Sequence, residues 1–345
     1  MHDFRSDTVT LPTPAMKAAI ATARLGDAAR GDDPTVAELE RLASALTGKD
    51  EALFLPSGTM ANLAALIAHD CRGGEVIIEQ TAHIYNSEGG GLSVLAGAVP
   101  RPIKGARGLL APDDVEPAIR GAADLALAPT RLICLENTHN AAGGTVMAPA
   151  SMAAIHAVAR RACLPVHLDG ARLFNAAAFL DTSIGELCRH VDSVWFALCK
   201  GLGGPVGAIL AGDVDFMRKA RRAARMLGGG MRQAGLLAAP AIVALQDPYC
   251  SHRRDNALAR RLARGFADLS PELMSGDVQT NIVNCFLDDA ADIARALGER
   301  GVLALAKGRR IRFVTHAQVD EASVEAAVAA LADILSMHRT RRAHA

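Results

Sequence analysis

Two charged residues stand at the ends of apolar runs that are typical of buried strands. Asp169 closes the run PVHLD and Lys200 closes the run SVWFALCK, and 31 residues separate them. This interval accommodates a strand, a helix and a strand, so we expect both side chains at the carboxyl edge of one parallel sheet, where such sheets bind ligands. A lysine among glycines in that place is a candidate Schiff-base amine. The alternatives are that Asp169 caps a helix or pairs with Arg172, and that Lys200 lies in an exposed turn.

A second group of residues is suited to binding anions. Ser57-Gly58-Thr59 follows an apolar run and opens a helical pattern. Free N–H groups at a helix start, two hydroxyls and a glycine that permits close approach suit a phosphate. An ordinary serine cap is the alternative. Arg232 follows the sequence GGGM, in which glycines allow its guanidinium to approach an anion, and its alternative is a solvated arginine at a helix start.

Three further features lie near expected strand ends. His83 stands just beyond a strand, beside a glycine run, and is a candidate for stacking on a flat ring or for general-base chemistry. The run ENTHN at 136–140 is densely polar, although asparagine and threonine also make turns. Arg312 alternates with apolar neighbours and is placed to clamp a carboxylate in bidentate fashion. A structural histidine and a solvent-facing arginine are the alternatives.

These parts together indicate a site for pyridoxal 5′-phosphate. A phosphate cradle would hold the cofactor, and a lysine would hold its aldehyde as a Schiff base. An aspartate would keep the pyridinium nitrogen protonated, so that the ring can absorb electrons. An arginine would fix the carboxylate of an amino-acid substrate.

The elements that position these residues alternate between strand and helix. Amphipathic helical patterns cover 34–46, 59–69 and 151–162. Short apolar runs, which we interpret as buried strands, cover 51–55, 75–79, 131–136, 165–169, 191–198 and 206–210. Short buried strands that alternate with helices predict a largely parallel sheet covered by helices on both faces.

The character of the chain changes near residue 247. Beyond it we expect helices at 251–269, 290–300 and 319–337 and strands at 280–287 and 310–314, which form a smaller α+β unit. The sequence therefore predicts three parts: an N-terminal arm at 1–30, a large cofactor-binding domain at 31–247 and a small C-terminal domain at 248–345.

Composition excludes several classes of protein. The 37 basic and 37 acidic residues leave no net charge, which argues against a general binder of nucleic acid or of anionic membranes. No apolar run is long enough to cross a bilayer, and charges occupy the N-terminus where a signal peptide needs an apolar core, so we expect a cytoplasmic protein. Seven scattered cysteines without a C-x-x-C pair, and histidines without an H-x-x-x-H pair, predict neither a disulfide framework nor a metal site.

These residues resemble the low-specificity L-threonine aldolases, which are fold-type I pyridoxal-phosphate enzymes of the aldolase and β-eliminating lyase group. The resemblance implies an aspartate-aminotransferase-like large domain, with a mostly parallel sheet between helices, and a small C-terminal α+β domain. The matching segments span nearly the whole chain in one order and are specific as a set: FRSDTVTLPTPAM (4–16), GDDPTVAELE (31–40), LFLPSGTMANLAAL (53–66), LICLENTHNAAGGTV (132–146), HLDGARLFNAA (167–177), CKGLGGPVGA (199–208), LGGGMRQAG (227–235) and RFVTH (312–316).

The resemblance also implies a role for each candidate residue. Lys200 carries the internal aldimine, Asp169 pairs with the ring nitrogen, and His83 stacks on the ring as the leading base candidate. By the same resemblance, the cofactor phosphate is bound by Ser57, Gly58, Thr59 and, across a subunit interface, Arg232. The substrate carboxylate is held by Ser6, Arg172 and Arg312. Arg172 also contacts the cofactor.

The implied reaction is the retro-aldol cleavage of L-threonine or L-allo-threonine to glycine and acetaldehyde. The family forms dimers or tetramers with sites at the dimer interface, so we expect a homo-oligomer. A β-eliminating lyase or an amino-acid racemase that uses the same Lys200 chemistry is one alternative. An inactive relative that only binds the cofactor is the other.

Two departures from the family pattern bear on the substrate. A pocket tyrosine of the family is Arg30 here, and a histidine thought to meet the substrate's β-hydroxyl is Ala126. Arg30 could bind an acidic group on the substrate, which is one hypothesis. The other is that Arg30 only pairs with a neighbouring carboxylate, that of Asp27, Asp32 or Asp33.

Overall fold

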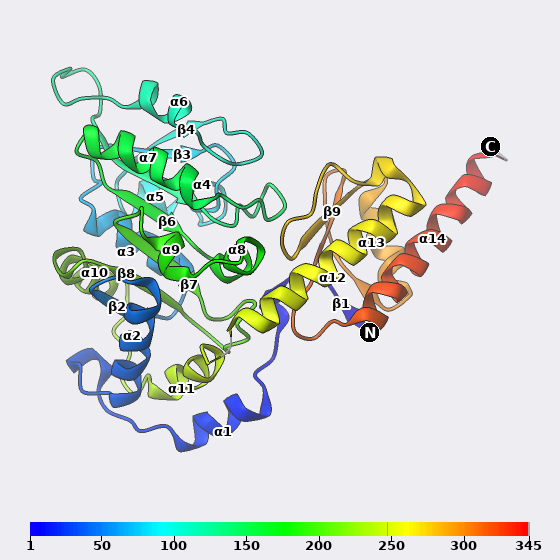
Figure 1. The fold of residues 1–345 in the computed structure, drawn as a ribbon, viewed down its shortest axis with the longest axis horizontal. Coiled ribbons are helices and arrows are strands. Elements are labelled where there is room, and N and C mark those ends of the chain that lie inside the picture. Colours follow the sequence, from blue (N-terminus) through cyan, green and yellow to red (C-terminus); the bar gives the residue numbers. More distant parts are fainter. Residues whose placement is uncertain (247, 344–345) are drawn as a thin grey trace.

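A computed structural model describes residues 1–246 and 248–343, and its centre is a seven-stranded sheet (Figure 1). The strands lie in the order β2-β8-β7-β6-β5-β3-β4. All neighbouring pairs are parallel except those of β8, which is antiparallel to β7 and β2. The mostly parallel α/β sheet predicted from the sequence is therefore confirmed. The strands are β2 (Glu51–Leu55), β3 (Glu75–Glu79), β4 (Val99–Ile103), β5 (Thr130–Glu136), β6 (Val166–Asp169), β7 (Ser193–Ala197) and β8 (Ala208–Gly212).

Helices cover both faces of this sheet, because alternate strand residues point to opposite sides. In β7, Trp195 and Ala197 pack with apolar residues of α3 and α10, whereas Val194 and Phe196 join the core under α2, α7, α8 and α9. The helices of this part are α1 (Pro14–Thr22), α2 (Pro34–Thr47), α3 (Gly58–Ala68), α4 (His83–Asn86), α5 (Gly91–Val94), α6 (Pro112–Val115), α7 (Pro149–Arg161), α8 (Leu173–Leu180), α9 (Ile184–Cys188), α10 (Val214–Met226) and α11 (Gly235–Ala244).

Strand β4 is the one strand of this sheet that the sequence analysis does not predict. Its sequence, VPRPI, contains Pro100 and Pro102, which lack the N–H that a central strand needs. The structure resolves the conflict by placing β4 at the edge of the sheet, where it pairs only with β3.

The C-terminal part has its own hydrophobic core. An antiparallel sheet of β11 (Leu305–Lys307), β12 (Arg310–Val314) and β9 (Ile282–Phe286) packs with α12 (Pro248–Leu269), α13 (Ala290–Glu299) and α14 (Glu321–Ala343). The chain start joins this core: β1 (His2–Asp3) pairs with β10 (Val302–Leu303), and Phe4 is fully buried. The domain boundary expected near residue 247 lies outside the described residues, so the three-part division stays a prediction.

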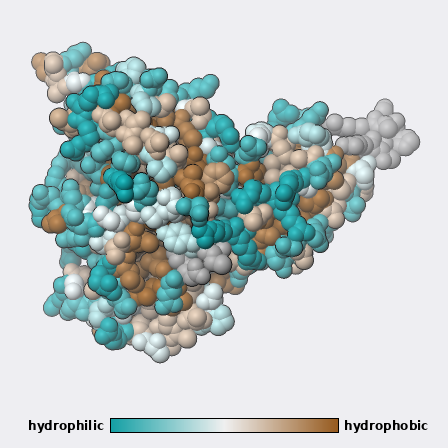
Figure 2. All heavy atoms as spheres, in the orientation of Figure 1, coloured by the Kyte–Doolittle hydropathy of each residue, from teal (hydrophilic) through white to brown (hydrophobic). Residues whose placement is uncertain are grey.

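Two surface properties complete the description. Apolar side chains gather on the face of the large lobe around α2 and α11 (Figure 2). Among the residues that the structure describes, no helix has the length and apolar character that crossing a membrane requires.

Candidate active site

The polar residues that follow β5, β6 and β7 meet at one edge of the sheet. The strand register aligns Glu136 with Asp169, and Asp169 with Trp195, so the carboxyl ends of the three strands lie side by side. Lys200 follows β7 by three residues, and its backbone carbonyl accepts from the Gly203 N–H at 2.8 Å and from the Thr10 hydroxyl at 3.2 Å. Asp169 and Lys200 therefore lie at the carboxyl ends of neighbouring strands, as the sequence predicts, and a shared crevice between them stays a prediction.

The Lys200 amine has no hydrogen-bond or ion-pair partner among the described residues. Its Nζ lies 5.7 Å from the centre of the Trp195 ring. Burial, and after it the nearby Arg172 guanidinium, lower the pKa of Lys200 because both disfavour the charged ammonium. An enclosed amine with a lowered pKa is suited to nucleophilic attack on a carbonyl group.

Asp169 is held as a hydrogen-bond acceptor. Its Oδ2 accepts from Asn62 Nδ2 at 3.0 Å, and its Oδ1 accepts from the Ala171 N–H at 3.1 Å. Arg172 donates instead to Asp7, through Nε and Nη2 at 2.7 Å each, so the Asp169–Arg172 ion pair is wrong. The helix-cap alternative is also wrong, because Arg172 occupies the cap position of α8.

The start of α3 packs against Trp195 of β7, the strand that precedes Lys200. Ser57 caps the helix by accepting from the Met60 N–H at 3.2 Å, so the ordinary serine cap is present. A Cβ on Gly58 would lie 2.3 Å from the Trp195 ring, which means that only glycine fits there. Thr59 follows in the first turn of the helix, whose free N–H groups make this end a suitable place for an anion.

Two arginines converge on one asparagine. Arg172 Nη1 and Arg312 Nη1 each donate to Asn140 Oδ1 at 3.2 Å. Burial by itself raises the pKa of Asp7, but the Arg172 guanidinium outweighs it, so the carboxyl pKa falls below its usual range. Arg312 has no carboxylate partner among the described residues, and burial together with Arg172 lowers its pKa to about 10. Arg312 is thus the arginine whose charge is available to a ligand carboxylate.

His83 is the first residue of α4 and is tied to two buried carboxylates. Its Nδ1 lies 3.2 Å from Glu88 Oε1, and this contact raises the pKa of His83 against the opposing effect of burial. Its backbone N–H donates to Glu136 Oε2 at 2.7 Å, while Glu136 Oε1 accepts from the Asn140 N–H at 2.7 Å. One side-chain nitrogen of His83 and one carboxylate oxygen each of Glu88 and Asp169 lie within 4.8 Å of one another.

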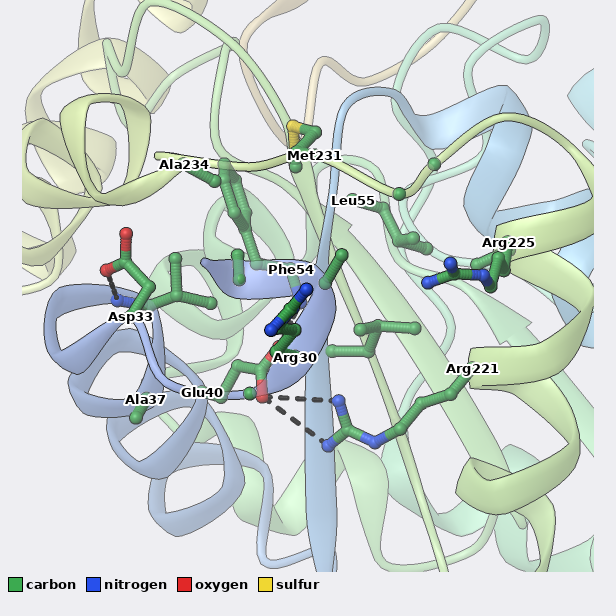
Figure 3. Close-up of a pocket in the computed structure, with 18 of the residues that line it drawn as sticks. Arg30, Asp33, Ala37, Glu40, Phe54, Leu55, Arg221, Arg225, Met231 and Ala234 are labelled. Carbon is green, nitrogen blue, oxygen red and sulfur yellow. Dashed lines mark hydrogen bonds and ion pairs between the residues drawn. The ribbon is translucent and has the colours of Figure 1, made fainter. Parts of the chain in front are cut away.

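Arg30 and Arg232 both pair with the carboxylate of Asp27. Arg30 Nε is 3.4 Å from Asp27 Oδ2, as the neighbouring-carboxylate hypothesis expects, and Arg232 Nη1 donates to the same carboxylate. Arg30 also lines a cavity of about 670 Å³ between α2 and α10, together with Arg225 (Figure 3). Ala126 is exposed in the loop before β5.

Comparison with known proteins identifies the family. The family model described as beta-eliminating lyase matches residues 3–290. Low-specificity L-threonine aldolase 1 of Arabidopsis thaliana is 39% identical, with 93% of each chain covered. Low specificity L-threonine aldolase of Escherichia coli K12 is 40% identical over 92% of this chain and 95% of its own. The chain belongs to the beta-eliminating lyase family. A structure of Leishmania major threonine aldolase, at 22% identity, shares the fold with a TM-score of 0.84 and covers 97% of this chain and 99% of that one.

The residues fit the cofactor expected for this beta-eliminating lyase. The Lys200 amine and the start of α3, which has room only for glycine, both contact the Trp195 ring, and Asp169, held by N–H donors, is the register partner of Trp195. Lys200 would hold the aldehyde carbon of pyridoxal 5′-phosphate, Asp169 would face its ring nitrogen, and the start of α3 would hold its phosphate.

Sequence reasoning missed three functional neighbours in this family member. Asp7 contacts Arg172. Ser6 accepts from the Thr8 N–H and caps the 3₁₀ turn Asp7–Val9, and its role at the substrate carboxylate stays a prediction. Asn62 lies in a segment predicted as an ordinary helix, and Glu88 lies in a segment without a predicted helix or strand. The one available signal was a polar residue within the apolar face of a predicted helix, which Asn62 is.

Proposed function

We propose that this protein cleaves L-threonine, L-allo-threonine or a related β-hydroxy-α-amino acid to glycine and an aldehyde, with pyridoxal 5′-phosphate as cofactor. The Lys200 amine, which has no hydrogen-bond or ion-pair partner in the described part of the chain and feels the charge of Asp169, carries the proposal. The names of the curated relatives supply the reaction type.

The residues of this chain divide the work. Arg312 binds the substrate carboxylate, and Asn140 orients the guanidinium by accepting from its Nη1. The cofactor supplies a sink for the electron pair that remains when the Cα–Cβ bond breaks. His83 accepts the β-hydroxyl proton at Nε2, because its Nδ1 is turned to Glu88 and the raised pKa makes the ring a better base.

We further propose a homodimer or homotetramer in which sites form at a subunit interface. Arg30 and Arg225 line the cavity between α2 and α10 together with the apolar Phe54 and Met231 (Figure 3), and Arg232, next to Met231, pairs with Asp27. In the dimer, Arg232 would contact the phosphate of the partner's site. A cytoplasmic location stays a prediction.

An aldehyde-release assay on the purified holoenzyme tests the activity. We expect acetaldehyde from L-threonine, and none after Lys200→Met, which keeps the volume of the side chain but removes the amine. The panel includes L-allo-threonine, phenylserine and 3-hydroxyaspartate. Faster turnover of 3-hydroxyaspartate than of L-threonine in the wild type, lost in Arg30→Tyr, would support the acidic-substrate hypothesis for Arg30. Equal turnover of 3-hydroxyaspartate by the wild type and Arg30→Tyr would reject it.

A further inference from the structure

We propose that four side chains form a directed chain of hydrogen bonds that ends on Asp169 and fixes its carboxylate: the half-buried His69 and the fully buried Ser193, His167 and Asn62. The distances along the chain are 2.7 Å from His69 Nε2 to Ser193 Oγ, 2.8 Å from Ser193 Oγ to His167 Nδ1, 3.1 Å from His167 Nε2 to Asn62 Oδ1 and 3.0 Å from Asn62 Nδ2 to Asp169 Oδ2. The inference rests on the proposed function only where it concerns the cofactor.

The direction of the chain is set at Asn62. Its amide nitrogen faces two carboxylate oxygens, Glu88 Oε1 at 2.8 Å and Asp169 Oδ2 at 3.0 Å, and carboxylates only accept. The two N–H groups of the amide satisfy one carboxylate each. The amide oxygen must therefore face His167, and His167 must carry a proton on Nε2 to donate to it.

The remaining links follow from this assignment. Burial, and after it His69, lower the pKa of His167 to about 3, so the ring is neutral and its Nδ1 can only accept. The Ser193 hydroxyl consequently donates to Nδ1. Because the single hydroxyl proton of Ser193 is donated to His167, Ser193 Oγ can only accept from His69 Nε2–H. Burial lowers the pKa of His69 to about 4, so this ring is neutral as well.

The fold explains why these side chains meet. Asn62 lies within α3 and His69 caps its end, seven residues apart, so two helical turns bring both to the same side of the helix. His167 of β6 and Ser193 of β7 are direct partners across the sheet. The chain therefore runs between α3 and the sheet, and His167, Ser193 and Asn62 are fully buried.

The physical effect is to hold the Asp169 carboxylate in place as the last acceptor of these hydrogen bonds. Donors that all point the same way polarise one another in a medium of low dielectric, and the sum acts on the last acceptor. An ionised Asp169 is what a protonated ring nitrogen needs as its partner. The four residues are thus positioning residues for Asp169, and no proton moves along them.

Nitrogen-15 NMR of the histidines in the cofactor-free protein tests the direction without any assay of activity. We expect His167 and His69 to stay neutral, with the proton on Nε2, between about pH 5 and 8, the range in which an ordinary histidine changes charge. A proton on Nδ1 of His167, or a charged ring in this range, would overturn the proposal. This readout is independent of whether the protein is an aldolase, so failure of the proposed function and failure of the chain are distinguishable.

Two substitutions at His167 then separate a positioning role from a merely structural one. In His167→Gln the side-chain amide nitrogen reaches about as far as Nε2 and can still donate to Asn62, whereas the shorter side chain of His167→Asn cannot. We expect the dissociation constant of pyridoxal 5′-phosphate to rise about tenfold in His167→Asn, the effect of one lost buried hydrogen bond, and to recover in His167→Gln. The ring-nitrogen signal of ¹⁵N-labelled cofactor should move toward the unprotonated value in His167→Asn alone.

A control variant removes core packing and leaves the four hydrogen-bonded side chains unchanged. Leu187→Ala leaves a cavity in the fully buried core beneath α9. It should lower the unfolding temperature while the cofactor's dissociation constant and ring-nitrogen signal stay unchanged. If His167→Gln behaves like His167→Asn, or if both behave like Leu187→Ala, the side chains only fill space and the proposal is wrong.

Discussion

Arg172 and Arg312 contact the same asparagine oxygen, yet their charges are balanced differently. Arg172 forms a bidentate ion pair with Asp7, and both side chains are buried. Arg312 has no such partner in the described part of the chain and keeps a lowered pKa of about 10. One arginine therefore holds the N-terminal segment in place, and the other is available to the substrate.

Arg312→Lys should weaken substrate binding more than it slows the chemical step. Lysine keeps the charge but loses the planar fork that matches a carboxylate. We expect KM to rise about 10- to 100-fold, the range for a lost charge-assisted hydrogen bond, with a smaller change in kcat. Arg310→Lys, on the same strand and bonded to the Ala141 carbonyl, is the matched control and should leave KM unchanged. Equal effects of the two variants would contradict the assignment.

Asp7→Asn should destabilise the fold by about 3–5 kcal/mol, because it leaves the buried Arg172 charge without its partner. The pKa of Asp7 is lowered in the folded protein, so the ion pair stabilises fully above the unfolded carboxyl pKa of about 3.9 and its contribution is lost as pH falls below that value. Urea unfolding of wild type and variant should therefore differ most at neutral pH and converge in acid. The exposed pair of Asp215 and Arg218 offers the control Asp215→Asn, which should change stability little at any pH.

Glu88→Gln should shift the pH dependence of catalysis. The Glu88 carboxylate raises the pKa of His83, and a general base must be unprotonated to act. Removing the carboxylate lowers the His83 pKa, so the acid limb of the kcat/KM profile should move to lower pH. A limb that stays in place would show that another group is the base.

At the level of the elements, one contact between α3 and β7 fixes how closely the start of α3 packs on the sheet. Gly58→Ala would place a Cβ 2.3 Å from the rigid Trp195 ring. We expect a loss of about 1–3 kcal/mol in the unfolding free energy of the cofactor-free protein, as for other overpacked cores. Trp195→Phe, which removes the outer ring, should recover part of the loss in the double variant. Gly121→Ala has open space around it and should be neutral; a neutral Gly58→Ala would contradict the packing argument.

Sequence reasoning located most elements of the large sheet because apolar runs and turn residues are local signals. It missed β4, since Pro100 and Pro102 argue against a strand unless the strand is known to lie at an edge. It placed Asp169 and Lys200 together from topology alone. It could not find Asp7 as the partner of Arg172, because 165 residues separate the two and only the packing of the chain start against the C-terminal core brings them together.

At the level of the whole molecule, the family predicted from the motifs is confirmed by the matched family model and the curated relatives. The proposed assembly makes a further prediction. If Arg232 completes the partner's site, Arg232→Ala and Lys200→Met should each be inactive, while mixed and refolded subunits should recover about a quarter of wild-type activity, because half of the dimers are hybrids with one intact site. A mixture that stays inactive would place Arg232 and Lys200 in the same site.

The most direct test of the account is a product balance with ¹³C-labelled L-threonine, followed by NMR on the holoenzyme. We expect glycine and acetaldehyde in equal amounts, with both absent in Lys200→Met. Formation of 2-oxobutyrate and ammonia, or of D-threonine, would instead show that the same site performs β-elimination or racemisation. Wild-type holoenzyme that yields none of these products would contradict the proposal that the Lys200 site is catalytic.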